Sequence, residues 1–80
     1  MVLTIDIGNT KTKVAVFDGE QLVEHIVFEC FSKGDIDLLV SRFKSFDGVI
    51  ISSVNANEEN RIAQLLDEFG IKCCLLSYKL

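Results

Sequence analysis

The sequence predicts an α/β fold in which a mixed β-sheet is covered by helices. Three observations lead to this prediction. Residues 2–28 contain three short runs with the alternating hydrophobicity of strands. The rest of the chain contains two runs with the apolar spacing of amphipathic helices, and each is followed by a continuous apolar run. Because helical crossovers join parallel strands and short turns join antiparallel ones, the expected element order is β-β-β-α-β-α-β.

The first strand, residues 2–7, carries Asp6 at its C-terminal end. Leu3 and Ile5 point to one face of the sheet, so Asp6 projects from the opposite face. A glycine-containing turn follows, and residues 14–17 form the second strand. The chain therefore presents a carboxylate beside a turn.

The second turn contains Asp18-Gly19, which is a strong hairpin signal. It leads into a third strand, residues 22–28, which completes an antiparallel meander. His25 lies in the middle of this strand beside Glu24. We interpret it as a partly exposed edge residue rather than a catalytic base.

Two helices follow the meander. The first opens at Asp35, interpreted as its N-cap, and runs to Phe43 with apolar residues at i, i+3, i+4 and i+7. Asp35 and Asp37 fall in its first turn, where carboxylates favour the positive helix end, so capping is preferred over catalysis for both. The second helix opens at Asn55 and ends at Gly70, the expected C′ residue.

The last two strands are predicted at residues 48–51 and 71–76. The first of these is apolar on both faces, which is typical of a central parallel strand. Ser52, Ser53 and Asn55 lie where that strand ends, the usual location of ligands in open sheets. These residues either line a ligand cleft or cap the helix that follows.

The composition excludes several classes of function. The 80-residue chain has a net charge of −4 and a pI of about 4.7, without a basic stripe, so the electrostatic term that dominates nucleic-acid binding is absent. No run approaches the ~20 apolar residues of a membrane span. The N-terminus enters a strand without a leader pattern. We expect a soluble cytoplasmic protein.

The chain is unusually apolar for its length. It is 49% hydrophobic with a mean hydropathy of +0.33, and a domain of this size buries only about 60% of its unfolded surface. Residues 73–80 form an apolar run with nothing after it to cover it. We therefore expect a continuation of the chain or a partner surface to cover this run. A free-standing half-domain that pairs through this strand edge is a further possibility.

The three cysteines are Cys30, Cys73 and Cys74. Their odd number, and the opposite directions of neighbouring strand residues, argue against a disulfide framework. A zinc site is excluded because the chain has one histidine and no Cys-x-x-Cys pair. We expect reduced, buried cysteines.

The turn after the first strand, within residues 6–13 (DIGNTKTK), suits the polyphosphate of a nucleotide. Glycine lets the backbone approach phosphate oxygens, and the N–H groups of residues 8–12 can donate to them. Asp6 cannot face phosphate, since two like charges about 4 Å apart repel by roughly 1 kcal/mol in water and about 4 in a partly dry site. It is better suited to holding a hydrated Mg²⁺, with Lys13 offsetting part of the remaining charge. The alternative is a polar hairpin turn with a solvated aspartate and lysine.

These residues carry a resemblance to a known family. A first strand ending in Asp-x-Gly-x-Thr, followed by a hairpin and this element order, resembles the superfamily of sugar kinases, heat-shock chaperones and actin. Residues 4–10 with Lys13, together with residues 49–54, resemble type III pantothenate kinases more narrowly. The resemblance covers essentially the whole chain. It implies a ribonuclease-H-like (actin-like ATPase) mixed sheet.

The resemblance also implies a function, namely ATP-dependent phosphorylation of pantothenate to 4'-phosphopantothenate, the first step of coenzyme A biosynthesis. It implies Mg²⁺, a monovalent cation (K⁺ or NH₄⁺) and a homodimer. Asp6 is carried over as the catalytic residue and as the Mg²⁺ ligand through water. The residues carried over as ATP-binding are Asp6, Gly8, Asn9, Thr10, Lys11, Thr12 and Lys13.

In such kinases a second domain carries the pantothenate pocket, a catalytic carboxylate and much of the dimer contact. We therefore interpret residues 1–80 as a truncated, ATP-phosphate-binding first domain of ribonuclease-H-like fold, with the second domain absent from this chain. Phosphoryl transfer depends on positioning two substrates, so the isolated chain is expected to be inactive.

Two other classes of protein share this fold. A nucleotide-sensing regulator could keep the phosphate loop and lose the alcohol-substrate site. A ribonuclease-H-like nuclease would need several convergent carboxylates, commonly including one on the strand after the first helix. That strand ends here in Ser52-Ser53, which argues against a nuclease.

Overall fold

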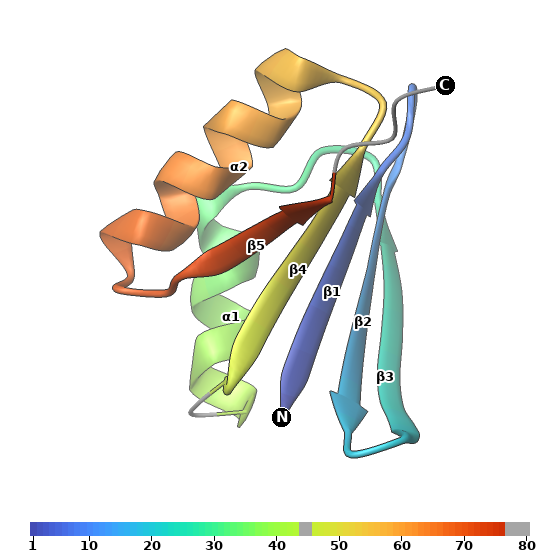
Figure 1. Cartoon of the computed structure of the whole chain (residues 1–80), viewed down its shortest axis with the longest axis vertical. Coiled ribbons are helices and arrows are strands. Elements are labelled where there is room, and N and C mark those ends of the chain that lie inside the picture. The colour runs from blue at the N-terminus through green and yellow to red at the C-terminus, as the bar shows by residue number, and fades with distance from the viewer. Residues whose placement is uncertain (44–45, 77–80) are drawn as a thin grey trace.

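The computed structural model describes residues 1–43 and 46–76, which form five strands and two helices (Figure 1). The order of elements is the predicted β-β-β-α-β-α-β. Residues 77–80 of the predicted C-terminal apolar run lie outside the described residues. The elements are β1 (Val2–Ile7), β2 (Thr12–Asp18), β3 (Gln21–Phe28), α1 (Lys33–Phe43), β4 (Gly48–Ser53), α2 (Ala56–Glu68) and β5 (Cys73–Leu76).

The strands form one mixed sheet in the order β3-β2-β1-β4-β5. The first three pair antiparallel, as a meander, and β4 and β5 are added parallel to β1. This confirms the predicted ribonuclease-H-like mixed sheet. β1 is central, so the C-terminal end of β1 lies between the start of β2 and the end of β4. In the turn between β2 and β3, Gly19 has φ +63°, as the hairpin signal required.

Both helices pack on the same face of the sheet (Figure 1). Alternate strand residues point into this face and join residues of both helices in one buried cluster. Asp6 and Lys13 occupy the intervening positions, so they lie on the face that neither helix covers. The buried apolar residues are Leu3, Ile5, Ile7, Val14, Val16, Phe31, Ile36, Leu39, Val49, Ile51, Ile62 and Leu66.

The first helix begins at Lys33, three residues before the Ile36 start that an N-cap at Asp35 predicts. Asp35 is the third residue of α1 rather than its N-cap. Its carboxylate accepts hydrogen bonds from the Ser32 backbone N–H and Oγ, both at 2.9 Å. The Ser32 carbonyl accepts the N–H groups of Asp35 and Ile36. The prediction was wrong because Ser32 precedes the helix and Asp35, in the first turn, accepts the Ser32 backbone N–H, which is one of the two hydrogen bonds of a capping box.

The second helix has the predicted ends. Asn55 Oδ1 accepts the N–H groups of Asn57 and Glu58 at 3.0 and 3.2 Å. At the other end, Ile71 N–H bonds to Leu66 O at 3.0 Å, a Schellman arrangement around Gly70. Gly70 has φ +72°, which explains why a glycine stands there.

A glycine pair tests this role of Gly70. Gly70→Ala is expected to lower the free energy of unfolding by about 1–2 kcal/mol, because alanine is strained at positive φ. Gly48→Ala is the matched control, since an added Cβ meets no atom within 4 Å at either position and only Gly70 has positive φ. Urea titrations should show the loss for Gly70→Ala alone. Equal losses would contradict the assignment.

The cysteines are only partly as expected. All three are free, but Cys30 and Cys74 are exposed, so the prediction of buried thiols was wrong for these two. Cys30 lies in the connection before α1, and Cys74 lies on the sheet face that the helices do not cover. Partial burial raises the pKa of the Cys73 thiol. Within residues 1–43 and 46–76, neither helix is long and apolar enough to cross a membrane.

Candidate functional site

Residues 8–11 connect β1 to β2 in a tight loop. Gly8 N–H donates to Lys11 O at 2.9 Å and closes the loop. A Cβ built on Gly8 would lie 3.2 Å from the same oxygen, which is tighter than ordinary contact. The glycines with positive φ are Gly19 and Gly70. Gly8 is therefore needed because of limited space, and not for the left-handed conformation that glycine can supply in turns.

The loop forms one wall of a cleft of about 260 Å³. The second wall is the connection between β3 and α1, and the third is the start of α2. Five of the predicted ATP-binding residues meet here. The cleft is lined by Ile7, Gly8, Asn9, Thr10, Lys11, Thr12, Glu29, Cys30, Asn55 and Glu58.

The other two predicted site residues lie on the sheet face beside the loop. Asp6 is the cross-strand partner of Lys13 on β2 and of Ser52 on β4. Asp6 and Lys13 are both exposed, and no ion pair joins these two residues in the part of the chain that the structure describes. The carboxylate and the ammonium group are thus both available to a ligand.

A protein-only metal site is absent from the described ranges 1–43 and 46–76, which hold no group of three or more His, Cys, Asp or Glu side chains suited to a metal ion. Mg²⁺ commonly takes one or two carboxylates and completes its octahedron with water and substrate phosphates. A single exposed carboxylate such as Asp6 fits that mode of binding.

The sequence left two roles open for the polar residues at the end of β4, namely lining a ligand cleft and capping the next helix, and the structure supports both in part. Ser53 Oγ donates to Asn55 O at 2.8 Å and accepts from Asn55 N–H at 2.9 Å. These two residues therefore shape the junction into α2, as the capping interpretation proposed, although Asn55 also lines the cleft. Ser52 points to the other face, beside Asp6. Val54 N–H bonds to Ile7 O at 3.1 Å and holds this junction against the end of β1.

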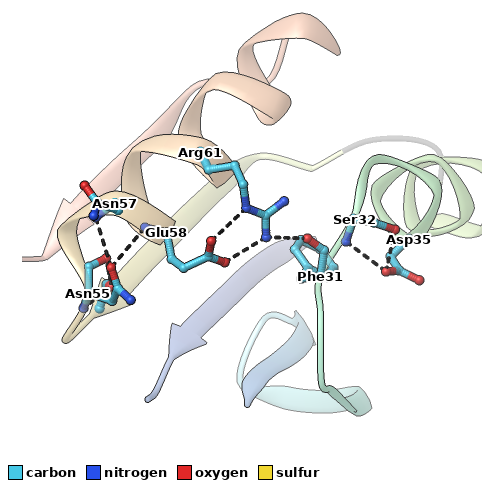
Figure 2. A network of polar contacts seen from close by, with 8 residues as sticks. Phe31, Ser32, Asp35, Asn55, Asn57, Glu58 and Arg61 are labelled. Carbon is cyan, nitrogen blue, oxygen red and sulfur yellow. Dashed lines mark hydrogen bonds and ion pairs between the residues drawn. The ribbon is translucent and has the colours of Figure 1, made fainter. Parts of the chain in front are cut away.

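A polar network behind the cleft was not predicted (Figure 2). Arg61 donates to both carboxylate oxygens of Glu58, from Nε at 3.0 Å and from Nη2 at 2.8 Å, and Nη2 also donates to Phe31 O at 2.7 Å. The hydrogen bond from Arg61 lowers the pKa of the Glu58 carboxyl and raises the pKa of Arg61. The i,i+3 spacing of Glu58 and Arg61 is a signal for their pairing. Nothing in the sequence indicates the contact with Phe31.

Comparison of the sequence with known proteins places this chain in a family. The sequence model of the type III pantothenate kinase family matches residues 2–79. A type III pantothenate kinase of Flavobacterium johnsoniae is 35% identical over 60 residues, which are 74% of this chain and 25% of that protein. Type III pantothenate kinases of Streptomyces griseus and Streptomyces coelicolor are 64% identical over 25 residues, 31% of this chain and 9% of theirs. The aligned part of the chain thus spans a quarter or less of the length of these relatives. The chain belongs to the type III pantothenate kinase family.

Proposed function

We propose that this chain forms the ATP-phosphate side of an enzyme that phosphorylates pantothenate to 4'-phosphopantothenate. The observation that carries the proposal is the closed loop at residues 8–11, which lies between Asp6 and Lys13 at the end of the central strand. Its polar side chains and main chain line a cleft, and the family of the chain supports the identity of the reaction.

Each part of the loop has a role in this proposal. The N–H groups of Asn9, Thr10 and Lys11 and the Asn9 and Thr10 side chains donate to phosphate oxygens. Lys13 offsets phosphate charge from the neighbouring strand. Asp6 holds Mg²⁺ through water, and the ion neutralises charge on the phosphates. Because phosphoryl transfer is chiefly positioning and charge stabilisation, such a loop can contribute to catalysis without a nucleophile of its own.

The remaining parts of the enzyme lie outside this chain in our proposal. The relatives are several times longer than the segment that matches them. We place the pantothenate pocket, a further catalytic carboxylate and most of the dimer contact in that additional length. We also propose a cytoplasmic homodimer that requires K⁺ or NH₄⁺. The isolated 80-residue chain should then be inactive as a kinase.

The test is ADP release by the natural protein that contains this chain. The assay contains Mg²⁺-ATP and K⁺ or NH₄⁺, with and without pantothenate, and the isolated chain is assayed in parallel. We expect pantothenate-dependent release by the natural protein and none by the isolated chain. ATP binding without any release would favour a nucleotide-sensing regulator. ADP release by the isolated chain would contradict the proposal that part of the catalytic site lies outside this chain.

Lys13→Ala tests the phosphate role of the lysine. We expect the KM for ATP to rise by up to about fivefold, because an exposed charge interaction contributes up to about 1 kcal/mol. The KM for pantothenate should change less. Lys72→Ala is the control, since Lys72 is also exposed but precedes β5, at the opposite end of the sheet. An unchanged KM for ATP in Lys13→Ala would exclude the phosphate role.

A further inference from the structure

The walls of the cleft come from three separate segments of the chain, and Arg61 joins two of them. Glu58, in the first turn of α2, lines the cleft, and so does Cys30 in the connection before α1. Arg61 is bonded to the Glu58 carboxylate and to the carbonyl of Phe31, the residue that follows Cys30. Figure 2 shows the guanidinium between these two partners.

The Phe31 carbonyl is a fixed point for this contact. The Phe31 ring is fully buried and lies 4.9 Å from the Phe28 ring, between centroids. The next residue, Ser32, is held by Asp35 at the start of α1. The Arg61 contact therefore ties α2 to a segment that the core already anchors, and this sets the distance between two walls of the cleft.

An arginine is required for this arrangement. Its planar guanidinium can bind both carboxylate oxygens and a third acceptor at once, whereas a lysine ammonium cannot reproduce that fork. Arg61 also neutralises the Glu58 carboxylate, whose pKa is lowered by the hydrogen bond from Arg61. Glu29 also lines the cleft, so without Arg61 a second carboxylate, that of Glu58, would face without its partner a cleft that is proposed to hold polyphosphate.

We propose that Arg61 is a positioning residue for ATP. It holds the start of α2 and the connection that contains Cys30, two walls of the cleft, at the separation that the phosphate loop requires. This inference rests on the proposed function, because it takes the cleft to be the ATP-phosphate site. Arg61 acts through Glu58 and Phe31 and need not touch the nucleotide.

The experiment measures the Kd for Mg²⁺-ATP by calorimetry, together with both KM values, in the natural protein and its variants. Arg61→Gln should weaken ATP binding by up to about fivefold and leave the KM for pantothenate unchanged. Arg61→Lys, which keeps the charge, should show a smaller but measurable loss. Arg42→Gln is the matched control, since Arg42 makes a similar exposed ion pair with Glu24 at 3.0 Å that does not line the cleft.

The double variant Glu58→Gln/Arg61→Gln separates geometry from charge. It removes both charges and the contact with Phe31 together. If Arg61 positions the walls, the double variant still binds Mg²⁺-ATP more weakly than the wild type does. Full recovery of affinity would overturn the positioning role and leave Arg61 only as a neutralising charge.

The remaining outcomes distinguish a failure of the inference about Arg61 from a failure of the proposed kinase function. An unchanged Kd in Arg61→Gln, or an equal loss in Arg42→Gln, would overturn the inference. So would a parallel rise in both KM values, which indicates a disturbance that is not specific to the ATP side of the site. A wild type that binds Mg²⁺-ATP without releasing ADP would refute the kinase proposal alone, and the Kd series would still decide the role of Arg61. A wild type that binds no Mg²⁺-ATP would refute both.

Discussion

The Asp6→Asn variant of the natural protein is expected to lose Mg²⁺-dependent ATP turnover by about 10²-fold or more, while its folding remains nearly intact. The magnitude is that of removing one group that stabilises developing charge in a transition state. Asparagine keeps the shape of aspartate but lacks the negative charge that attracts a hydrated Mg²⁺. Folding is spared because Asp6 is exposed and makes no ion pair among the described residues. Surface substitutions of this kind usually change stability by less than about 0.5 kcal/mol.

The measurement is kcat at saturating ATP across a series of Mg²⁺ concentrations, with the thermal midpoint recorded for each variant. Asp18→Asn is the control, since Asp18 is also exposed but ends β2 at the hairpin turn. We expect the control to keep full turnover. Full turnover in Asp6→Asn would reduce Asp6 to a turn residue and remove the basis of the proposed metal role.

The Phe31→Ala substitution is expected to lower the free energy of unfolding by about 3–5 kcal/mol, because it leaves a cavity where a large ring was buried. The Phe31 side chain is 0% exposed and belongs to the cluster beneath both helices. Small domains are stable by only about 5 kcal/mol at the lower end of the usual range. A chain of that stability would keep only about 0–2 kcal/mol after the substitution, so the variant should be marginally stable at room temperature.

Urea titration followed by far-ultraviolet circular dichroism measures this effect in the chain. Leu38→Ala is the control, since Leu38 on α1 is 64% exposed. It should change the free energy of unfolding by less than about 0.5 kcal/mol. A loss below about 1 kcal/mol for Phe31→Ala would show that the connection before α1 is not part of the core.

Local patterns were sufficient to predict the strands, the antiparallel meander and the second helix, although β5 begins at Cys73, two residues later than predicted. The alternation around Ile5, the turn glycine Gly19 and the caps Asn55 and Gly70 each act within a few residues, so the sequence displays them directly. The parallel orientation of β4 was also predicted from the sequence, because a continuous apolar run after a helix is typical of a buried parallel strand.

Features that depend on distant contacts were missed. The burial of Phe31 was not predicted, because a single aromatic residue between a strand and a helix carries no periodicity. The contact between Arg61 and the Phe31 carbonyl joins residues far apart in sequence. The predicted site is divided in the structure: Asp6 and Lys13 lie on the open face of the sheet, and the loop lies at the cleft. This division depends on which face the helices cover. Strand alternation does not specify that face.

The central place of β1 has a consequence for the order in which the chain folds. On one side β1 pairs with β2, which follows after a short loop, and hairpins of this kind form within about 1–10 μs. On its other side β1 pairs with β4, which begins only at Gly48, and such non-local pairing is slower. A two-stranded hairpin alone has marginal stability in water. We therefore expect the docking of β4 to be the step that commits the chain to its fold. The same step brings Ser52 beside Asp6, so the loop is shaped early and its surroundings are completed last.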